Sequence, residues 1–219
     1  MKNDPLHAIL EEVRDSWGIR SPDDEHWHAK RRKTAGEYEW VLEKLALRQS
    51  DKLLDIGCGT GLFLEYINEM VNISVGIDIS ETMLKRASRN LIYKHNVSLL
   101  RSAAPLLPFC KPIFNKIVIV HAAFGVFIPN PHLWNIYNEG MMDLSADVIK
   151  NAFSLLLPHG VLVLTLAPGS KDVGEKAKRK LIPDAMKKAG IGTEDASVTT
   201  TVRKLESTYF ALVRIERKS

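Results

Sequence analysis

The stretch from position 51 to 62 constrains the fold of this chain more than any other part of the sequence. It reads as a buried strand over residues 53–56, followed by a turn and then by apolar residues at helical spacing from about Thr60 onward. The turn contains three closely spaced glycines, Gly57, Gly59 and Gly61. Glycine in such a strand–turn–helix unit permits positive φ angles and close approach of the backbone to a ligand.

The spacing of these glycines argues against two phosphate-binding motifs. A dinucleotide fingerprint needs G-x-G-x-x-G, but Gly61 comes one residue early and Leu62 stands at the fingerprint position. The Gly-Lys-Ser/Thr ending of a Walker A loop is absent. Asp55, two residues before the first glycine, would repel a pyrophosphate. This acidic turn therefore favours a ligand with a cationic end.

A second acidic residue ends the next predicted strand, over residues 71–80. Asp78 lies 78 − 55 = 23 positions after Asp55, close to the separation of about 20 found in one strand–helix–strand unit. In a doubly wound sheet, an acidic residue at this place accepts hydrogen bonds from ribose hydroxyls. Ser80 is a suitable N-cap for a helix from Glu81 to about Leu91. The ligand is therefore expected to carry a ribose as well as a cationic group.

The segment Asp55-Ile-Gly-Cys-Gly-Thr-Gly61 resembles the first motif of the class I S-adenosylmethionine-dependent methyltransferases. The resemblance is strongest over residues 53–80 and extends more weakly from Tyr38 to the end of the sequence. It implies an α/β fold: a doubly wound, mostly parallel seven-stranded sheet of the Rossmann-like methyltransferase type, completed by an antiparallel hairpin. The implied cofactor is S-adenosyl-L-methionine, which carries an ammonium and a sulfonium.

Twelve residues are expected to contact this cofactor through the turn, the strand ends and the adenine-binding segment. They are Asp55, Gly57, Cys58, Gly59, Gly61, Asp78, Ile79, Met83, Ser102, Ala103, Ala104 and His121. Within this set, Ile79 and Met83 are placed to flank an adenine ring.

The sequence departs from the family in the segment that normally contacts the adenine amino group. When this sequence is aligned with the family on Leu-Pro-Phe at residues 107–109, Ala103 stands where the family has its acidic residue, and Ser102 lies beside it. The backbone of Ala103 and Ala104, or the hydroxyl of Ser102, is expected to substitute.

His121 ends the predicted fourth strand, residues 114–121, at the edge where ligands bind in open α/β sheets. It is the first candidate for a general base, because an imidazole titrates near neutral pH, with His132 and His28 behind it. The competing interpretation is a histidine that hydrogen-bonds the backbone at a strand end.

The remaining pattern predicts the rest of the sheet and two covering segments. A helix over residues 143–157 stops at Pro158-His-Gly160, and strands follow at 161–166, 198–205 and 209–215, with a basic helical segment at 174–190. Residues 1–35 and 125–142 carry aromatic side chains and are expected to close over the acceptor. The whole chain is predicted to be a single domain, 1–219, with a helical extension at 1–50 and a Rossmann-like core at 51–219.

Composition sets wider limits. Two cysteines provide neither a disulfide framework nor metal-ligand spacing, so no metal is expected and a reducing cytoplasm is the default. No apolar run approaches membrane-spanning length, and no signal peptide pattern is evident. A net charge of +4 does not by itself identify a nucleic-acid binder.

The acceptor is left open by the sequence. Transfer to a small molecule, such as a sugar or secondary metabolite, is the leading interpretation, because His121-Ala-Ala-Phe124 replaces the Asn/Asp-Pro-Pro-aromatic motif of amino-methylating nucleic-acid enzymes. The alternatives are an RNA or protein methyltransferase, which basic residues at 30–33 and 171–188 would suit, and a non-catalytic S-adenosylmethionine-binding protein. The oligomeric state is not predicted.

Overall fold

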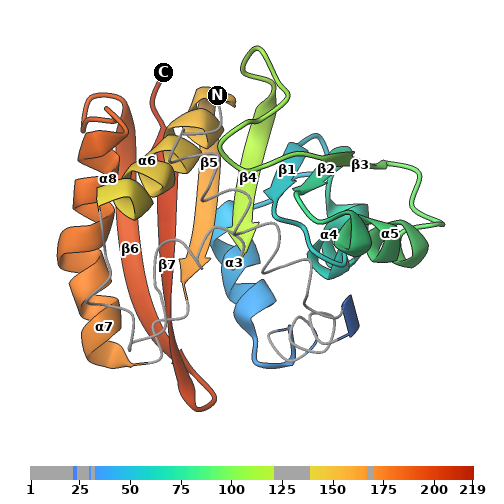
Figure 1. Ribbon diagram of the computed structural model, residues 1–219, viewed down its shortest axis with the longest axis horizontal. Coiled ribbons are helices and arrows are strands. Elements are labelled where there is room, and N and C mark those ends of the chain that lie inside the picture. The colour runs from blue at the N-terminus through green and yellow to red at the C-terminus, as the bar shows by residue number, and fades with distance from the viewer. Residues whose placement is uncertain (1–21, 24–29, 31–32, 121–138, 167–169) are drawn as a thin grey trace.

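A computed structural model describes residues 22–23, 30, 33–120, 139–166 and 170–219. Seven strands form one sheet in the order β3-β2-β1-β4-β5-β7-β6 (Figure 1). Strands β1 to β5 pair in parallel, and β7 runs antiparallel to both β5 and β6. The doubly wound, mostly parallel sheet predicted from the sequence is therefore confirmed. The strands are β1 (Lys52–Ile56), β2 (Ile73–Asp78), β3 (Val97–Arg101), β4 (Phe114–Val120), β5 (Leu156–Leu166), β6 (Ala196–Leu205) and β7 (Thr208–Arg217).

Helices cover both faces of the sheet (Figure 1). One face packs against α3 (Glu37–Leu45), α4 (Leu62–Ile67) and α5 (Glu81–Asn90), with the short 3-10 helix η1 (Asn68–Met70) after α4. The other packs against α6 (Glu139–Ser154), α7 (Lys171–Lys176) and α8 (Ile182–Lys188), with the π-helical turn η3 (Ala177–Leu181) joining the last two.

The central strands are apolar on both faces because both faces are covered. In β4, Ile117 and Ile119 pack on the α6 side while Val118 packs on the α3 side, and all three are fully buried. This continuous apolar run is typical of strands in the middle of a parallel sheet.

The turn after β1 is built from left-handed backbone. Gly57, Gly59 and Gly61 have φ angles of 75°, 53° and 76°. At Gly61, an added Cβ would also lie 2.8 Å from Leu91 Cδ1 and 3.1 Å from Ala87 Cβ. Gly61 therefore serves both the turn and the close packing of α5 beneath it.

One predicted boundary was wrong. The sequence predicted that a helix would continue to residue 157 and that Pro158-His-Gly160 would precede the fifth strand. In the structure α6 ends at Ser154 and β5 already begins at Leu156. The register between β4 and β5 shifts between Phe114 and Lys116, so that the intervening residues form an irregular segment within the strand, with His159 at φ 61°. A proline is tolerated at such a bulge because it has no ladder hydrogen bond to donate there.

Most of the predicted covering segments lie outside the described residues. Of the first segment, residues 1–35, the structure describes only residues 22–23, 30 and 33–35, and of the second, residues 125–142, only residues 139–142. Within the described part of the chain, no helix is long and apolar enough to cross a membrane.

Replacing Gly61 by alanine is expected to destabilise the protein more than replacing Gly190 by alanine. Both glycines have positive φ (76° and 70°), so each substitution carries a similar backbone cost of about 1–2 kcal/mol. Only Gly61 is also crowded by Leu91, which should add about 1–3 kcal/mol of overpacking. Urea unfolding of the two variants measures the difference. Equal losses of unfolding free energy in the two variants would mean that Leu91 moves aside at no energetic cost.

Candidate functional site

The first three strands of the sheet bring the predicted site residues to one edge. Because β1, β2 and β3 are parallel neighbours, their carboxyl ends meet there. Asp55 lies one residue before the end of β1, and Asp78 is the last residue of β2. Ser102 follows β3 directly, and its N–H donates to the backbone carbonyl of Asp78 at 3.1 Å. The structure therefore places the turn, Asp78 and the 102–104 segment side by side.

The backbone donors of the glycine turn are used within the protein. The N–H groups of Gly57 and Cys58 both donate to the carbonyl of Ile77, at 2.7 and 2.9 Å. The N–H of Gly59 donates to Oδ2 of Asp78 at 2.9 Å, and that of Gly61 donates to the carbonyl of Cys58. The turn is thus bound to the end of β2, and these four donors do not form a phosphate cradle. This agrees with the preference for a cationic ligand expected from the sequence.

The carboxylate of Asp78 is held at two points. Besides the bond from Gly59, its Oδ1 accepts the N–H of Ser80 at 2.8 Å. An ionised carboxylate has about four acceptor positions, so this anchoring is compatible with ribose hydroxyls donating to the same group. Ser80 in turn caps α5, as predicted, with its Oγ accepting the N–H of Met83 at 3.4 Å.

Asp55 is buried next to this carboxylate, with only 2% of its surface exposed. Burial, followed by repulsion from the charge of Asp78, raises the pKa of Asp55 from 3.8 to about 8. In the free protein Asp55 is therefore mostly protonated at neutral pH. A cation arriving at this place would offset the repulsion between the two carboxylates and favour ionised Asp55.

Cys58 takes part in the glycine turn through its backbone, and its thiol is not reactive. Its side chain is buried, and burial, followed by the charges of Asp55 and Asp78, raises the pKa of the thiol well above its ordinary value. A cysteine in such surroundings stays a neutral thiol and is unreactive. The sulfur also lies against Gly76 of β2, where an added Cβ would be only 2.9 Å away.

The side chains expected at the adenine differ in their surroundings. Ile79 is half-buried at the end of β2, whereas Met83 is 2% exposed and packs in the protein interior. Ala103 is half-buried, and Ala104 packs against the core. Ser102 Oγ donates to the carbonyl of Leu106 at 2.5 Å. A hydroxyl that donates its one proton still has acceptor capacity, which is what an adenine amino group requires.

Two supporting residues were not predicted from the sequence. Arg101 donates from Nε to the carbonyl of Ile79 at 3.1 Å and pairs with Glu81 at 3.3 Å, which fixes the segment after β2. Asn90 donates from Nδ2 to the carbonyl of Thr60 at 2.9 Å and ties the glycine turn to the end of α5. The first contact depends on the parallel register of β2 and β3, which sets Arg101 opposite Asp78 and which the sequence does not contain. Nothing in the local sequence indicates the second.

The candidate bases His121, His132 and His28 lie outside the described residues. The strand that leads to the first of them is described: β4 pairs with β1 and ends at Val120. The assignment of His121 to catalysis or cofactor binding therefore stays a prediction.

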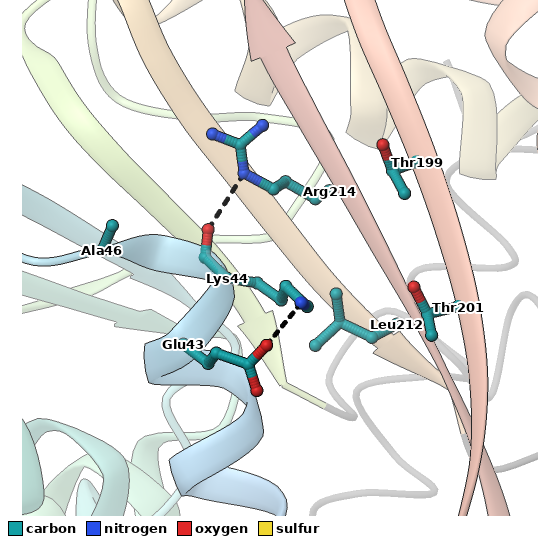
Figure 2. Close-up of a pocket in the computed structure, with 7 residues that line it drawn as sticks. All are labelled: Glu43, Lys44, Ala46, Thr199, Thr201, Leu212 and Arg214. Atoms are coloured by element: carbon teal, nitrogen blue, oxygen red, sulfur yellow. Dashed lines mark hydrogen bonds and ion pairs between the residues drawn. The ribbon is translucent and has the colours of Figure 1, made fainter.

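A pocket of about 330 Å³ lies elsewhere, between the end of α3 and the hairpin β6–β7 (Figure 2). It is separated from β1 by β4 and β5 in the sheet. Its charged groups bind within the protein: Lys44 Nζ contacts Glu43 at 2.6 Å, and Arg214 donates to the carbonyl of Lys44 at 3.0 Å and to Glu216 at 2.7 Å. This polar hollow contains none of the predicted cofactor residues.

Comparison with known proteins agrees with this geometry. Residues 53–145 match a protein family described as a methyltransferase domain. A malonyl-[acyl-carrier protein] O-methyltransferase of Marinomonas sp. (strain MWYL1) is 33% identical over 146 residues, which cover 64% of this chain and 47% of that protein. The chain thus aligns with about half the length of this relative. An 18S rRNA (guanine-N(7))-methyltransferase of Mus musculus is 53% identical over 51 residues, which cover 22% of this chain and 18% of that protein.

The fold has solved counterparts. The structure of DhpI in complex with S-adenosylhomocysteine superposes with a TM-score of 0.66 at 12% identity, over 97% of this chain and 98% of that chain. At this identity the likeness concerns the fold alone. The fold, the glycine turn with its paired carboxylates and the family match agree with one another. Residues 53–145 therefore carry a methyltransferase domain, and the chain has the Rossmann-like fold of the class I S-adenosylmethionine-dependent methyltransferases, the family that its glycine turn resembles.

Proposed function

We propose that this protein binds S-adenosylmethionine at the carboxyl ends of β1, β2 and β3 and transfers its methyl group to a small-molecule acceptor. The observation that carries the cofactor site is the buried acid Asp55 beside half-buried Asp78, whose carboxylate the glycine turn binds through the N–H of Gly59. A ligand with an ammonium beside Asp55 and a ribose beside Asp78 satisfies both carboxylates.

The chain's own residues chiefly position the reactants. When bound, the cofactor supplies a methyl group that its sulfonium already makes electrophilic. Asp55 would hold the ammonium, Asp78 would fix the ribose, and the segment after β3 would align the adenine through Ser102. Such fixation favours in-line attack by holding donor and acceptor at a reactive distance. For an oxygen acceptor, His121 is proposed as the base.

The small-molecule acceptor is supported by what the basic segment does. On α7–α8, Arg179 pairs with Glu175 and Lys188 with Asp143, so part of the positive charge is neutralised within the chain. The motif of amino-methylating nucleic-acid enzymes is absent after β4. The relatives described above are named for a malonyl-[acyl-carrier protein] and for 18S rRNA as acceptors, so the acceptor of this chain is tested directly. Labelled S-adenosylmethionine should transfer label to a metabolite extract and leave total RNA and total protein unlabelled. Label found only in a macromolecular fraction would refute the small-molecule acceptor.

Replacing Asp78 should weaken cofactor binding. Charge-assisted hydrogen bonds contribute about 1.5–3 kcal/mol each, so losing those to the ribose should lower affinity for S-adenosylhomocysteine by roughly 10 to 10³-fold in Asp78→Asn. Calorimetry measures the dissociation constant. Asp184→Asn, an exposed aspartate on α8, is the matched control and should bind as the parent does. An unchanged constant in Asp78→Asn would place the ribose elsewhere.

Cofactor affinity should rise with pH and level off near pH 8. Because Asp55 has a pKa of about 8 in the free protein, an ammonium that needs the ionised form must displace a proton below that pH. Affinity should then increase by up to about tenfold per pH unit, with up to about one proton released. Calorimetry in buffers of different ionisation enthalpy measures this release. Asp55→Asn should bind weakly and without this dependence. If the affinity of the unmodified protein does not change with pH, the ammonium does not bind at Asp55.

The raised pKa of Asp55 has the opposite effect on the stability of the free protein, which should fall as pH rises. With a folded pKa above the unfolded value of 3.8, Asp55 stabilises the fold fully at low pH, and this contribution is lost as pH rises toward 8. Bound cofactor should offset that loss, which urea unfolding with and without S-adenosylhomocysteine can follow.

RNA binding should be negligible near physiological salt. Non-specific binding through several phosphates falls steeply with salt, with a log–log slope of about −0.7 per phosphate on single strands. Transfer RNA should therefore show no micromolar binding at about 0.15 M salt. If it does bind, and if exchanging Lys178, Arg179 and Lys180 for serine abolishes the binding, an RNA acceptor would replace the small-molecule one.

A further inference from the structure

Exposed apolar side chains concentrate around one edge of the sheet. Among the described residues, seven large apolar side chains are exposed, and six of them lie between positions 70 and 106. The most exposed are Tyr93 (84%), Ile92 (67%) and Leu106 (60%). The other three are Met70, Ile73 and Leu100, whereas the seventh, Val198, lies on β6. Where exposed apolar side chains join into a continuous patch, they mark an interaction surface.

These side chains flank both ends of the edge strand β3. Met70 and Ile73 belong to the segment that Asn96, just before β3, binds through its side chain at the carbonyls of Asn68 and Val71. Ile92 and Tyr93 lie in the turn that leads to the same end of the strand. At the other end, Leu106 is bound to Ser102. Leu100 lies within the strand.

Among the described residues, no strand pairs with the outer edge of β3. In the part of the chain that the structure describes, β3 pairs with β2 alone, and it is an outer strand of the sheet (Figure 1). Its sequence, Val-Ser-Leu-Leu-Arg, contains no lysine or proline, and its one charged residue, Arg101, turns back to Ile79 and Glu81. The opposite edge, β6, carries exposed Arg203 and Lys204. Native proteins commonly use such charges to block pairing at a strand edge, and β3 lacks them.

The backbone of β3 presents donors and acceptors outward. Asn96 accepts from Ser74 and Ser102 donates to Asp78, so even-numbered positions face β2. Because backbone groups alternate along a strand, the N–H and C=O groups of Val97, Leu99 and Arg101 point away from the sheet. A further strand can therefore bind there without disturbing β2.

We propose that two copies of this chain associate through β3, paired antiparallel about a two-fold axis at Leu99. In this arrangement Arg101 of one copy lies opposite Val97 of the other, so no like charges face each other within the strands. The end that carries Leu106 meets the end that carries Tyr93 and Ile92 of the other copy. Each end therefore contacts an apolar counterpart.

Each end of β3 carries one acid and one base, Glu69 and Lys94 beside its start and Glu81 and Arg101 beside its end. Glu81 already pairs with Lys85 and Arg101 of its own chain, so the apolar side chains and the strand edge carry the association. A stable interface buries about 800 Å² per partner, more than a five-residue strand provides alone, so the apolar ends must take part. A second copy is the occupant that fits both ends at once.

Sedimentation velocity over a dilution series tests the proposal. The unmodified protein should sediment as a dimer of the 24.6 kDa chain and dissociate on dilution. Leu100→Glu would place two carboxylates diagonally across the axis and should raise the dimer dissociation constant about tenfold or more. Val198→Glu is the matched control, because Val198 is 42% exposed on the other edge strand and Leu100 is 40% exposed on β3. This control should dimerise normally.

Hydrogen exchange identifies the interface independently of any variant. The amides of Val97, Leu99 and Arg101 should gain protection at concentrations where the dimer forms and lose it on dilution. Binding of S-adenosylhomocysteine by Leu100→Glu confirms that this variant folds. A chain that stays monomeric throughout its soluble range would overturn the proposal, since the edge would then be available to a different protein. So would a dimer in which these amides remain unprotected, or one that Leu100→Glu leaves intact.

Discussion

The hydrogen bonds between the glycine turn and the end of β2 are the interaction on which the site depends. Ile77 accepts two backbone donors of the turn, and Asp78 accepts a third. Each of these contacts requires the turn to lie directly against β2, which is why the turn has left-handed glycines. The same bonds set Asp78 beside Asp55 and the helix α5 beneath Gly61. Loss of this contact would separate the parts that are proposed to hold the ammonium and the ribose.

The position of Asp55 has an energetic cost that a ligand can reduce. A buried carboxyl group beside a second carboxylate is most stable as the neutral acid, as the raised pKa of Asp55 indicates. This arrangement does not stabilise the free protein at neutral pH. It makes sense in a site whose ligand brings a positive charge, because the cation then favours the ionised form that the fold disfavours. The cofactor of this family has such a charge.

The sheet separates three kinds of surface. The carboxyl ends of the parallel strands form the proposed cofactor site. The lateral edge at β3 has outward-facing backbone groups and exposed apolar side chains near both of its ends, whereas the lateral edge at β6 carries exposed Arg203 and Lys204. An association through β3 would leave the carboxyl edge open in each copy, because strand pairing extends the sheet sideways.

The sequence by itself determined the strand–turn–helix unit, the acidic residue after the second strand and the N-cap at Ser80. These are local patterns: glycine spacing, apolar periodicity and capping residues act over a few positions, and the structure confirms the elements that they predict. Resemblance to a known family then implied the mostly parallel seven-stranded sheet with its antiparallel hairpin, which local patterns do not contain, and the structure confirms it.

Only the tertiary structure decided how these parts are connected. The early start of β5 depends on pairing with β4 through an irregular register, which no local signal around Pro158 reveals. The contacts from Arg101 to Ile79 and from Asn90 to Thr60 join positions far apart in the sequence. The neutral state of Asp55 depends on burial and on the charge of Asp78, and the exposure of Leu100 depends on β3 being an edge. Burial, charge proximity and edge position arise from how the whole chain packs, so they are fixed only when the fold is complete.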